Sequence, residues 1–234
     1  MDTAPSVMVC KCAERHLLDP KALEKARNEK HAVCVPDLCE LAAKSDQLLQ
    51  EFVTQPAPII YACHPRAVKA LFVHADAPLP EDAQVVDLRS SASKPAVEPS
   101  NCEWPPWFPV IDKDRCVNCK QCLEFCLFGV YETDDSDQVR VANPANCKNN
   151  CPACARICPE AAIIFPKCGE EPINGAEILD EQSLRANIKN NVDELLGDNI
   201  YATLNERKKK RRSLLDRKKV KNAIAEREKW RGTP

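Results

Sequence analysis

Residues 116–126 read CVNCKQCLEFC, and residues 147–159 read CKNNCPACARICP. The first run has C-x2-C-x2-C-x3-C spacing, and the second has C-x3-C-x2-C-x3-C-P spacing. Their cysteines are Cys116, Cys119, Cys122, Cys126, Cys147, Cys151, Cys154 and Cys158. Three thiolates so closely spaced can bind three corners of one iron–sulfur cube, while the fourth cysteine of the run reaches a different cube. The sequence therefore predicts two [4Fe-4S] clusters bound by cysteine.

Two other kinds of site share part of this pattern. Zinc ribbons use C-x2-C pairs on separate knuckles, and four cysteines within eleven or twelve residues, twice over, do not fit that geometry. Radical SAM enzymes share the C-x3-C-x2-C spacing of Cys147, Cys151 and Cys154. Such enzymes need a long strand–helix barrel after the motif. They also need a glycine-rich segment, and none follows here. Cys158 and Pro159 instead supply a fourth cluster ligand, so the sequence favours paired clusters.

The segment 104–172 resembles the dicluster ferredoxins of bacteria. That resemblance implies an α+β ferredoxin-like fold and crossed ligation, in which the last cysteine of each run joins the other run. One cluster would take Cys116, Cys119, Cys122 and Cys158, and the other Cys126, Cys147, Cys151 and Cys154. The chain departs from the family pattern in Leu127, where proline is usual, and in the three-residue gap after Cys147. The longer gap leaves Cys168 as an alternative to Cys147.

The composition favours a reducing compartment. Fifteen cysteines would suggest disulfides in a secreted protein. The first residues show neither the basic segment nor the apolar segment of a signal peptide, and no stretch approaches the ~20 apolar residues of a membrane span. We therefore expect a cytoplasmic protein whose clustered cysteines bind metal.

The segment 6–88 alternates strand and helix signals. Short apolar runs predict strands at residues 7–10, 32–35, 59–62 and 84–88. Helix formers and helical apolar spacing predict helices at residues 20–29, 36–52 and 66–72. This order implies a small α/β domain with a parallel sheet covered by helices.

Cysteines follow the predicted strands of this domain, at the edge of a parallel sheet where ligands bind. This part of the chain resembles the N-terminal domain of the flavin-containing A subunit of heterodisulfide reductases. The resemblance lies in the segment VCKC (9–12), a lone cysteine after the second strand and the segment ACHPR (62–66). That resemblance implies a third iron–sulfur cluster held by Cys10, Cys12, Cys39 and Cys63. A redox-active thiol pair and purely structural buried thiols remain the alternatives.

The remaining segments predict partners rather than chemistry. We expect residues 1–89 to form the α/β domain, 90–103 a linker, 104–172 the ferredoxin module and 173–234 a charged helical tail. Residues 200–234 hold 13 Lys/Arg and 4 Asp/Glu, a net charge of +9, whereas residues 1–199 hold 20 and 31, a net charge of −11. The basic tail is explained by a solvated helix, by docking on an acidic protein or, less readily, by nucleic-acid binding.

Together these patterns predict an electron carrier, or an electron-transfer subunit, that exchanges single electrons with an oxidoreductase partner. The alternatives are a thiol/disulfide reductase that uses the N-terminal cysteines, and an iron–sulfur protein that binds nucleic acid through its tail.

Overall fold

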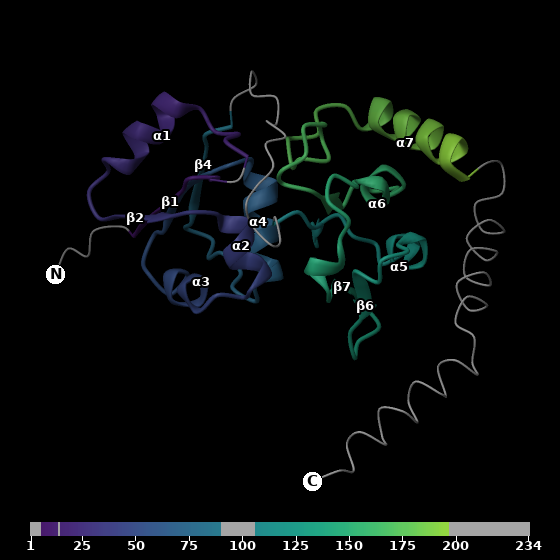
Figure 1. The fold of residues 1–234 in the computed structure, drawn as a ribbon, viewed down its shortest axis with the longest axis horizontal. Helices are drawn as coiled ribbons and strands as arrows, with labels where there is room; N and C mark the ends of the chain where they lie inside the picture. Colours follow the sequence, from purple (N-terminus) through teal and green to yellow (C-terminus); the bar gives the residue numbers. More distant parts are fainter. Residues whose placement is uncertain (1–5, 14, 90–105, 197–234) are drawn as a thin grey trace, which may run out of the picture. The chain divides into compact units, whose positions relative to one another are not determined.

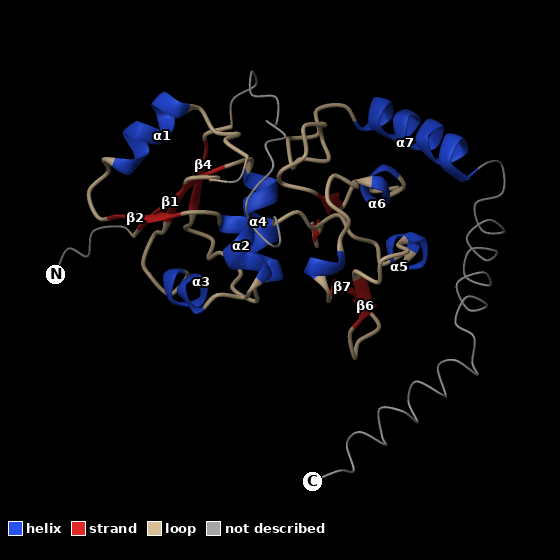
Figure 2. Cartoon of the chain, in the orientation of Figure 1, coloured by secondary structure: helices blue, strands red, loops and turns tan. Residues whose placement is uncertain are grey.

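The computed structural model describes residues 6–13, 15–89 and 106–196 of the chain, with side chains described as far as residue 188. The N-terminal part is a four-stranded parallel sheet in the order β2-β1-β3-β4 (Figures 1 and 2). Its strands are β1 (Val7–Cys10), β2 (Ala32–Val35), β3 (Ile59–Ala62) and β4 (Gln84–Asp87). All four residues of the central strand β1 are buried, as a parallel strand covered on both faces requires.

Helices connect the strands as the alternating sequence pattern predicts. They are α1 (Pro20–Arg27), α2 (Leu38–Ala43), α3 (Gln47–Phe52) and α4 (Pro65–His74), with α2 packed against α4 (Figure 1). Asp19 caps α1 by accepting a hydrogen bond from the amide of Ala22, and a proline follows at the first helical position.

The single helix predicted over residues 36–52 is wrong, because the chain forms two helices there. Ser45 adopts a left-handed backbone conformation with φ of 47°, which ends α2. Asp46 then caps α3 through the amide of Leu48. The apolar residues keep helical spacing across the break, so periodicity alone does not reveal it.

The second part is built from short antiparallel pairs around small helices. Strand β5 (Val110–Ile111) pairs with β8 (Ile163–Ile164), and β6 (Tyr131–Thr133) pairs with β7 (Val139–Val141). Between them lie α5 (Gln121–Phe125), the 3-10 turn Pro144–Asn146 and α6 (Ala153–Arg156), and α7 (Glu181–Leu196) follows. Phe108, Ile164 and Phe165 fill the core beneath these strands, each at most 2% exposed.

The two parts pack against each other within one compact unit that ends at Lys189, and the chain from Asn190 belongs to a second unit. Gly175 marks a close approach between the parts. A Cβ atom there would lie 2.6 Å from the Cβ of Ala67 on α4, and its φ of 94° is rarely open to other residues. Glycine is therefore required where this loop crosses α4.

The structure confirms a mixed α/β chain with a small parallel sheet, followed by short antiparallel strand pairs. The predicted linker at 90–103 and the tail beyond residue 196 lie outside the described residues, and the predicted domain boundaries stay predictions. In the part of the chain that is described, no helix has the length and apolar character needed to span a bilayer.

Candidate metal centres

The first group of cysteines surrounds one hollow that is partly open to solvent. Its cysteine lining is Cys116, Cys119, Cys122 and Cys158. Asn118 and Lys120 both have positive φ, so the backbone turns sharply between the cysteines of the first run. Cys116, Cys119 and Cys122 thereby all line the hollow. Cys158, 32 or more residues further on, follows α6.

Cys122 shows what this grouping does electrostatically. Burial first, and then the neighbouring thiolates of Cys158, Cys119 and Cys116, together raise its pKa to about 12. Four thiolates in such a space repel each other unless a positive centre lies among them. Iron ions provide that centre, and a coordinating thiol loses its proton outright. The donor set and the hollow therefore fit a cysteine-bound iron–sulfur cluster.

The second group consists of Cys126, Cys147, Cys151 and Cys154. Burial, and after it the charges of Cys126 and Cys151, raise the pKa of Cys147 to about 12. Cys126 and Cys151 therefore lie close to Cys147. Burial also raises the pKa of Cys154, and Cys147 and Cys126 are again among its neighbours. The last cysteine of the first run thus lies with the first three of the second run, as crossed ligation requires.

Cys147 lies within this group, whereas Cys168 has different surroundings. The sulfur of Cys168 accepts a hydrogen bond from the amide of Glu170 at 3.5 Å, and its charged neighbours are Glu170, Arg156 and Arg89. This placement favours Cys147 over Cys168 as a ligand of the second group.

The longer gap after Cys147 has a structural role. Asn150 has a φ of 57°, so the extra residue makes a turn. The guanidinium of Arg15 donates to the side-chain oxygens of Asn149 at 3.2 Å and Asn150 at 2.7 Å, and it also lies 5.3 Å from the ring centre of Trp107. The gap therefore serves as a contact point for the N-terminal part.

Protein dipoles point at the sulfurs of both groups. The amide of Ala162 donates to the sulfur of Cys158 at 3.3 Å, and the hydroxyl of buried Tyr131 donates to the sulfur of Cys154 at 3.1 Å. Hydrogen bonds of this kind stabilise negative charge on a ligating sulfur and so tune a metal site.

The N-terminal cysteines, the third group, gather around a hollow of their own. Its lining includes Cys10, Cys12, Cys39 and Cys63, together with Asp37 and Lys167. Cys10 ends β1, Cys63 follows β3, and Cys39 lies on α2, so the carboxyl edge of the sheet brings them together as predicted. Cys34, on β2, is not part of this lining.

Burial dominates the chemistry of this third group. It raises the pKa of Cys10 well above its usual value, with Asp37 and then Cys12 adding to the effect. Burial also raises the pKa of Cys63 to about 12. The amide of Leu38 donates to the sulfur of Cys10 at 3.3 Å.

A buried ion pair, which the sequence did not predict, lies in the wall of this hollow. The ammonium of Lys167 lies 2.5 Å from a carboxylate oxygen of Asp37, and their side chains are 4% and 2% exposed. Asp37 also caps α2 by accepting from the amides of Cys39 and Glu40. The cap is readable from the sequence, but nothing local marks Lys167 as its partner.

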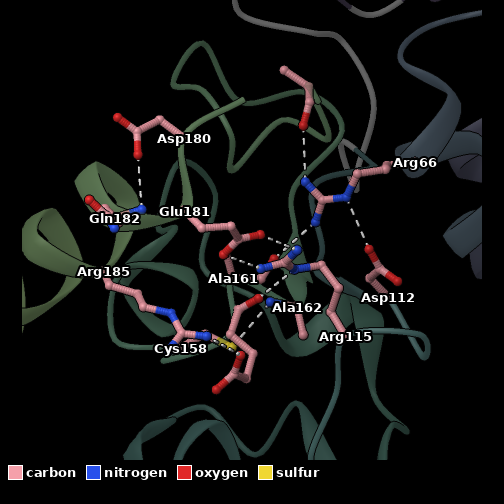
Figure 3. A network of polar contacts seen from close by, with 12 residues as sticks. Arg66, Asp112, Arg115, Cys158, Ala161, Ala162, Asp180, Glu181, Gln182 and Arg185 are labelled. Carbon is pink, nitrogen blue, oxygen red and sulfur yellow. Dashed lines mark hydrogen bonds and ion pairs between the residues drawn. The ribbon is translucent and has the colours of Figure 1, made fainter. Parts of the chain in front are cut away.

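Arg66 is a second missed residue, although it stands in the quoted segment 62–66. It is the second residue of α4 and reaches into the second part of the chain, where it contacts Asp112 and Ala161 (Figure 3). It also donates to the carbonyl of Ala176. The neighbouring Arg115 forms a two-pronged ion pair with Glu181.

Within the described residues, no three His, Cys, Asp or Glu side chains converge on one point as a single metal ion demands. Ligands of a cubane cluster do not converge in that way, because each cysteine binds a different iron atom.

Known proteins share the second part of the chain. A family model described as a 4Fe-4S dicluster domain matches residues 108–159. An uncharacterized ferredoxin of Methanocaldococcus jannaschii is 48% identical over 26% of this chain, which spans 41% of that relative. Ferredoxin-3 of a Nostoc species is 36% identical over 24% of this chain and 76% of its own length. The pyruvate synthase subunit PorD of M. jannaschii is 32% identical over 26% of this chain and 67% of its own length. No solved structure matches the chain significantly.

Proposed function

Since this chain belongs to the 4Fe-4S dicluster ferredoxin family, we propose that it carries single electrons through two [4Fe-4S] clusters to or from an oxidoreductase. The crossed grouping of the cysteines is the observation that carries this proposal. Cluster 1 is held by Cys116, Cys119, Cys122 and Cys158, and cluster 2 by Cys126, Cys147, Cys151 and Cys154.

The clusters supply the one-electron chemistry, and the surrounding residues set its conditions. Burial of Cys154 and Cys158 keeps water from the inner ligands, and the donors Ala162 and Tyr131 stabilise the sulfurs. Cys119 is exposed, so cluster 1 has an edge at the protein surface. Such an edge allows electron exchange with a partner.

Exposed apolar side chains adjoin the cysteine runs and support a docking role. Val117, Leu127 and Phe128 are 64%, 61% and 43% exposed. They flank Cys116 and Cys126 in the chain, close to ligands of both proposed clusters. Large exposed apolar residues are typical of protein contact sites. One relative is named as a subunit of pyruvate synthase, which is consistent with an oxidoreductase as partner here.

Cysteine variants test the two clusters directly. Anaerobically reconstituted protein should bind about eight iron and eight sulfide ions in the two clusters and give the electron paramagnetic resonance (EPR) signals of reduced [4Fe-4S] centres. Cys147→Ser should impair cluster 2 alone, whereas the matched Cys168→Ser should keep both clusters. A full cluster complement in Cys147→Ser and loss of one cluster in Cys168→Ser would reverse the ligand assignment. Failure of the wild-type chain to bind iron would refute the proposed function.

A third cluster at Cys10, Cys12, Cys39 and Cys63 is a second proposal, which their shared hollow supports. Iron and sulfide near twelve per chain would agree with it, and values that stay near eight after full reconstitution would contradict it. The alternative, a thiol/disulfide reductase, needs a reactive thiolate. The raised pKa values of the buried thiols make that role less favourable.

Nucleic-acid binding is the remaining alternative, and it depends on the basic segment 200–234, which lies outside the described residues. Retention on DNA or RNA that weakens steeply with salt would favour it over a plain electron carrier.

A further inference from the structure

Arg66 connects the N-terminal sheet domain to the peptide that bonds a cluster ligand. Its side chain is 20% exposed. Its Nε donates to Asp112 at 3.0 Å, one terminal nitrogen to the carbonyl of Ala176 at 3.0 Å, and the other to the carbonyl of Ala161 at 3.0 Å (Figure 3). Three bonds from one planar group fix the guanidinium in place.

The carbonyl of Ala161 and the amide N–H of Ala162 belong to the same peptide unit. That N–H donates to the sulfur of Cys158 at 3.3 Å (Figure 3). A cationic donor at a carbonyl oxygen withdraws electron density from the whole peptide, so its N–H becomes a stronger donor. The positive charge of Arg66 therefore acts on Cys158 through a single peptide.

We propose that Arg66 is a positioning residue that raises the reduction potential of cluster 1 by polarising the peptide between Ala161 and Ala162. This inference rests on the proposed role of Cys158 as a ligand. When cluster 1 accepts one electron from its redox partner, the negative charge on the cysteine sulfurs would grow and no bond would break. A stronger N–H···S hydrogen bond stabilises that reduced state, so the N-terminal domain tunes the ferredoxin module.

Arg66 could also act simply by its net charge, and the structure offers a way to separate the two effects. Asp112 pairs with Arg66, so the double variant Arg66→Met/Asp112→Asn removes the cationic donor but keeps the net charge. The backbone of Asp112 would still accept from the amide of Cys116 and donate to the carbonyl of Ala162.

A matched control lies on the neighbouring peptide. Arg115 donates to the carbonyl of Glu160 at 2.7 Å, but the N–H of that peptide, on Ala161, donates to the carbonyl oxygen of Cys158 and not to its sulfur. The variant Arg115→Met/Glu181→Gln also removes an ion pair without changing net charge. It should leave the potential of cluster 1 unchanged.

The test is a redox titration of the reconstituted full chain, followed by EPR spectroscopy, with cluster 2 as internal reference. Arg66→Met/Asp112→Asn should lower the reduced-to-oxidised ratio of cluster 1 about threefold at fixed potential, a shift of about 30 mV from the 59 mV per decade of a one-electron couple. Arg66→Lys keeps a cationic donor and should recover at least half of that shift.

An unchanged potential in Arg66→Met/Asp112→Asn, or an equal shift in the Arg115 control, would overturn the peptide route. If the double variant assembles no cluster 1, Arg66→Lys decides, because a shift as large as threefold there contradicts the proposal and a smaller one supports it. Absence of clusters from the wild-type chain would count against the ligand assignment instead, and iron analysis distinguishes that result.

Discussion

Replacing Lys167 by methionine should destabilise the chain strongly. The substitution leaves the carboxylate of Asp37 buried without its cation, and loss of one partner from a buried ion pair costs about 3–5 kcal/mol. The amides of Cys39 and Glu40 still donate to that carboxylate, so we expect the lower end, about 3 kcal/mol. For a chain of this size that corresponds to a melting temperature lower by about 6–12 °C.

The double variant Lys167→Met/Asp37→Asn is the matched control for that prediction. It removes both charges while asparagine still caps α2, and replacing a buried pair by neutral groups is often close to neutral in stability. Urea unfolding followed by circular dichroism, under anaerobic conditions, should show the double variant recovering most of the loss. A loss below about 1 kcal/mol in the single variant would refute the reasoning, as would a double variant no more stable than the single one.

Three further substitutions test two contacts around the cysteine groups and one buried histidine. Arg15→Met should reduce unfolding free energy by about 1.5–3 kcal/mol, because its charged hydrogen bonds to Asn150 and its neighbour are lost; equal stability in urea would contradict this. Tyr131→Phe should keep both clusters but lower the potential of cluster 2, since Cys154 loses its O–H donor; an unshifted EPR-monitored titration would speak against that role. Burial lowers the pKa of His74, so the unfolded chain binds its proton more readily and stability should fall as the pH drops below about 6.5. His74→Leu should weaken that pH dependence in urea unfolding, and an unaltered slope would exclude His74 as its source.

Local sequence patterns predicted most of the strands because each one depends on its own residues. The apolar runs at β1, β2 and β3 lie where the structure has them, since β-branched residues favour a buried strand wherever it pairs. The break between α2 and α3 was not predictable in the same way. It depends on a left-handed Ser45, a conformation that serine does not signal in the sequence.

The candidate cysteine groups were predictable from their spacing and from the resemblance to dicluster ferredoxins, and their ligation of clusters stays a prediction. The residues around those groups were not predictable. Arg15 and Asn150 are 135 residues apart, and Asp37 and Lys167 are 130 residues apart. Polar and charged residues of these types are usually solvated, so composition gives no reason to pair them across the fold.

These distant contacts make the N-terminal part of the chain a component of the surroundings of the cysteine groups. Arg66 bonds to the peptide beside Cys158, Arg15 to the turn that follows Cys147, and Arg89 to the carbonyls of Pro166 and Cys168. All three arginines come from the N-terminal sheet domain, while Lys167 makes the reverse contact to Asp37. Each charged side chain is held at a defined place by the opposite part, so the surroundings of the proposed clusters are shared between the two. A change in the N-terminal domain therefore acts on the electrostatics of the cysteine groups without touching a single ligand, and the module cannot be treated as an isolated ferredoxin with an inert extension.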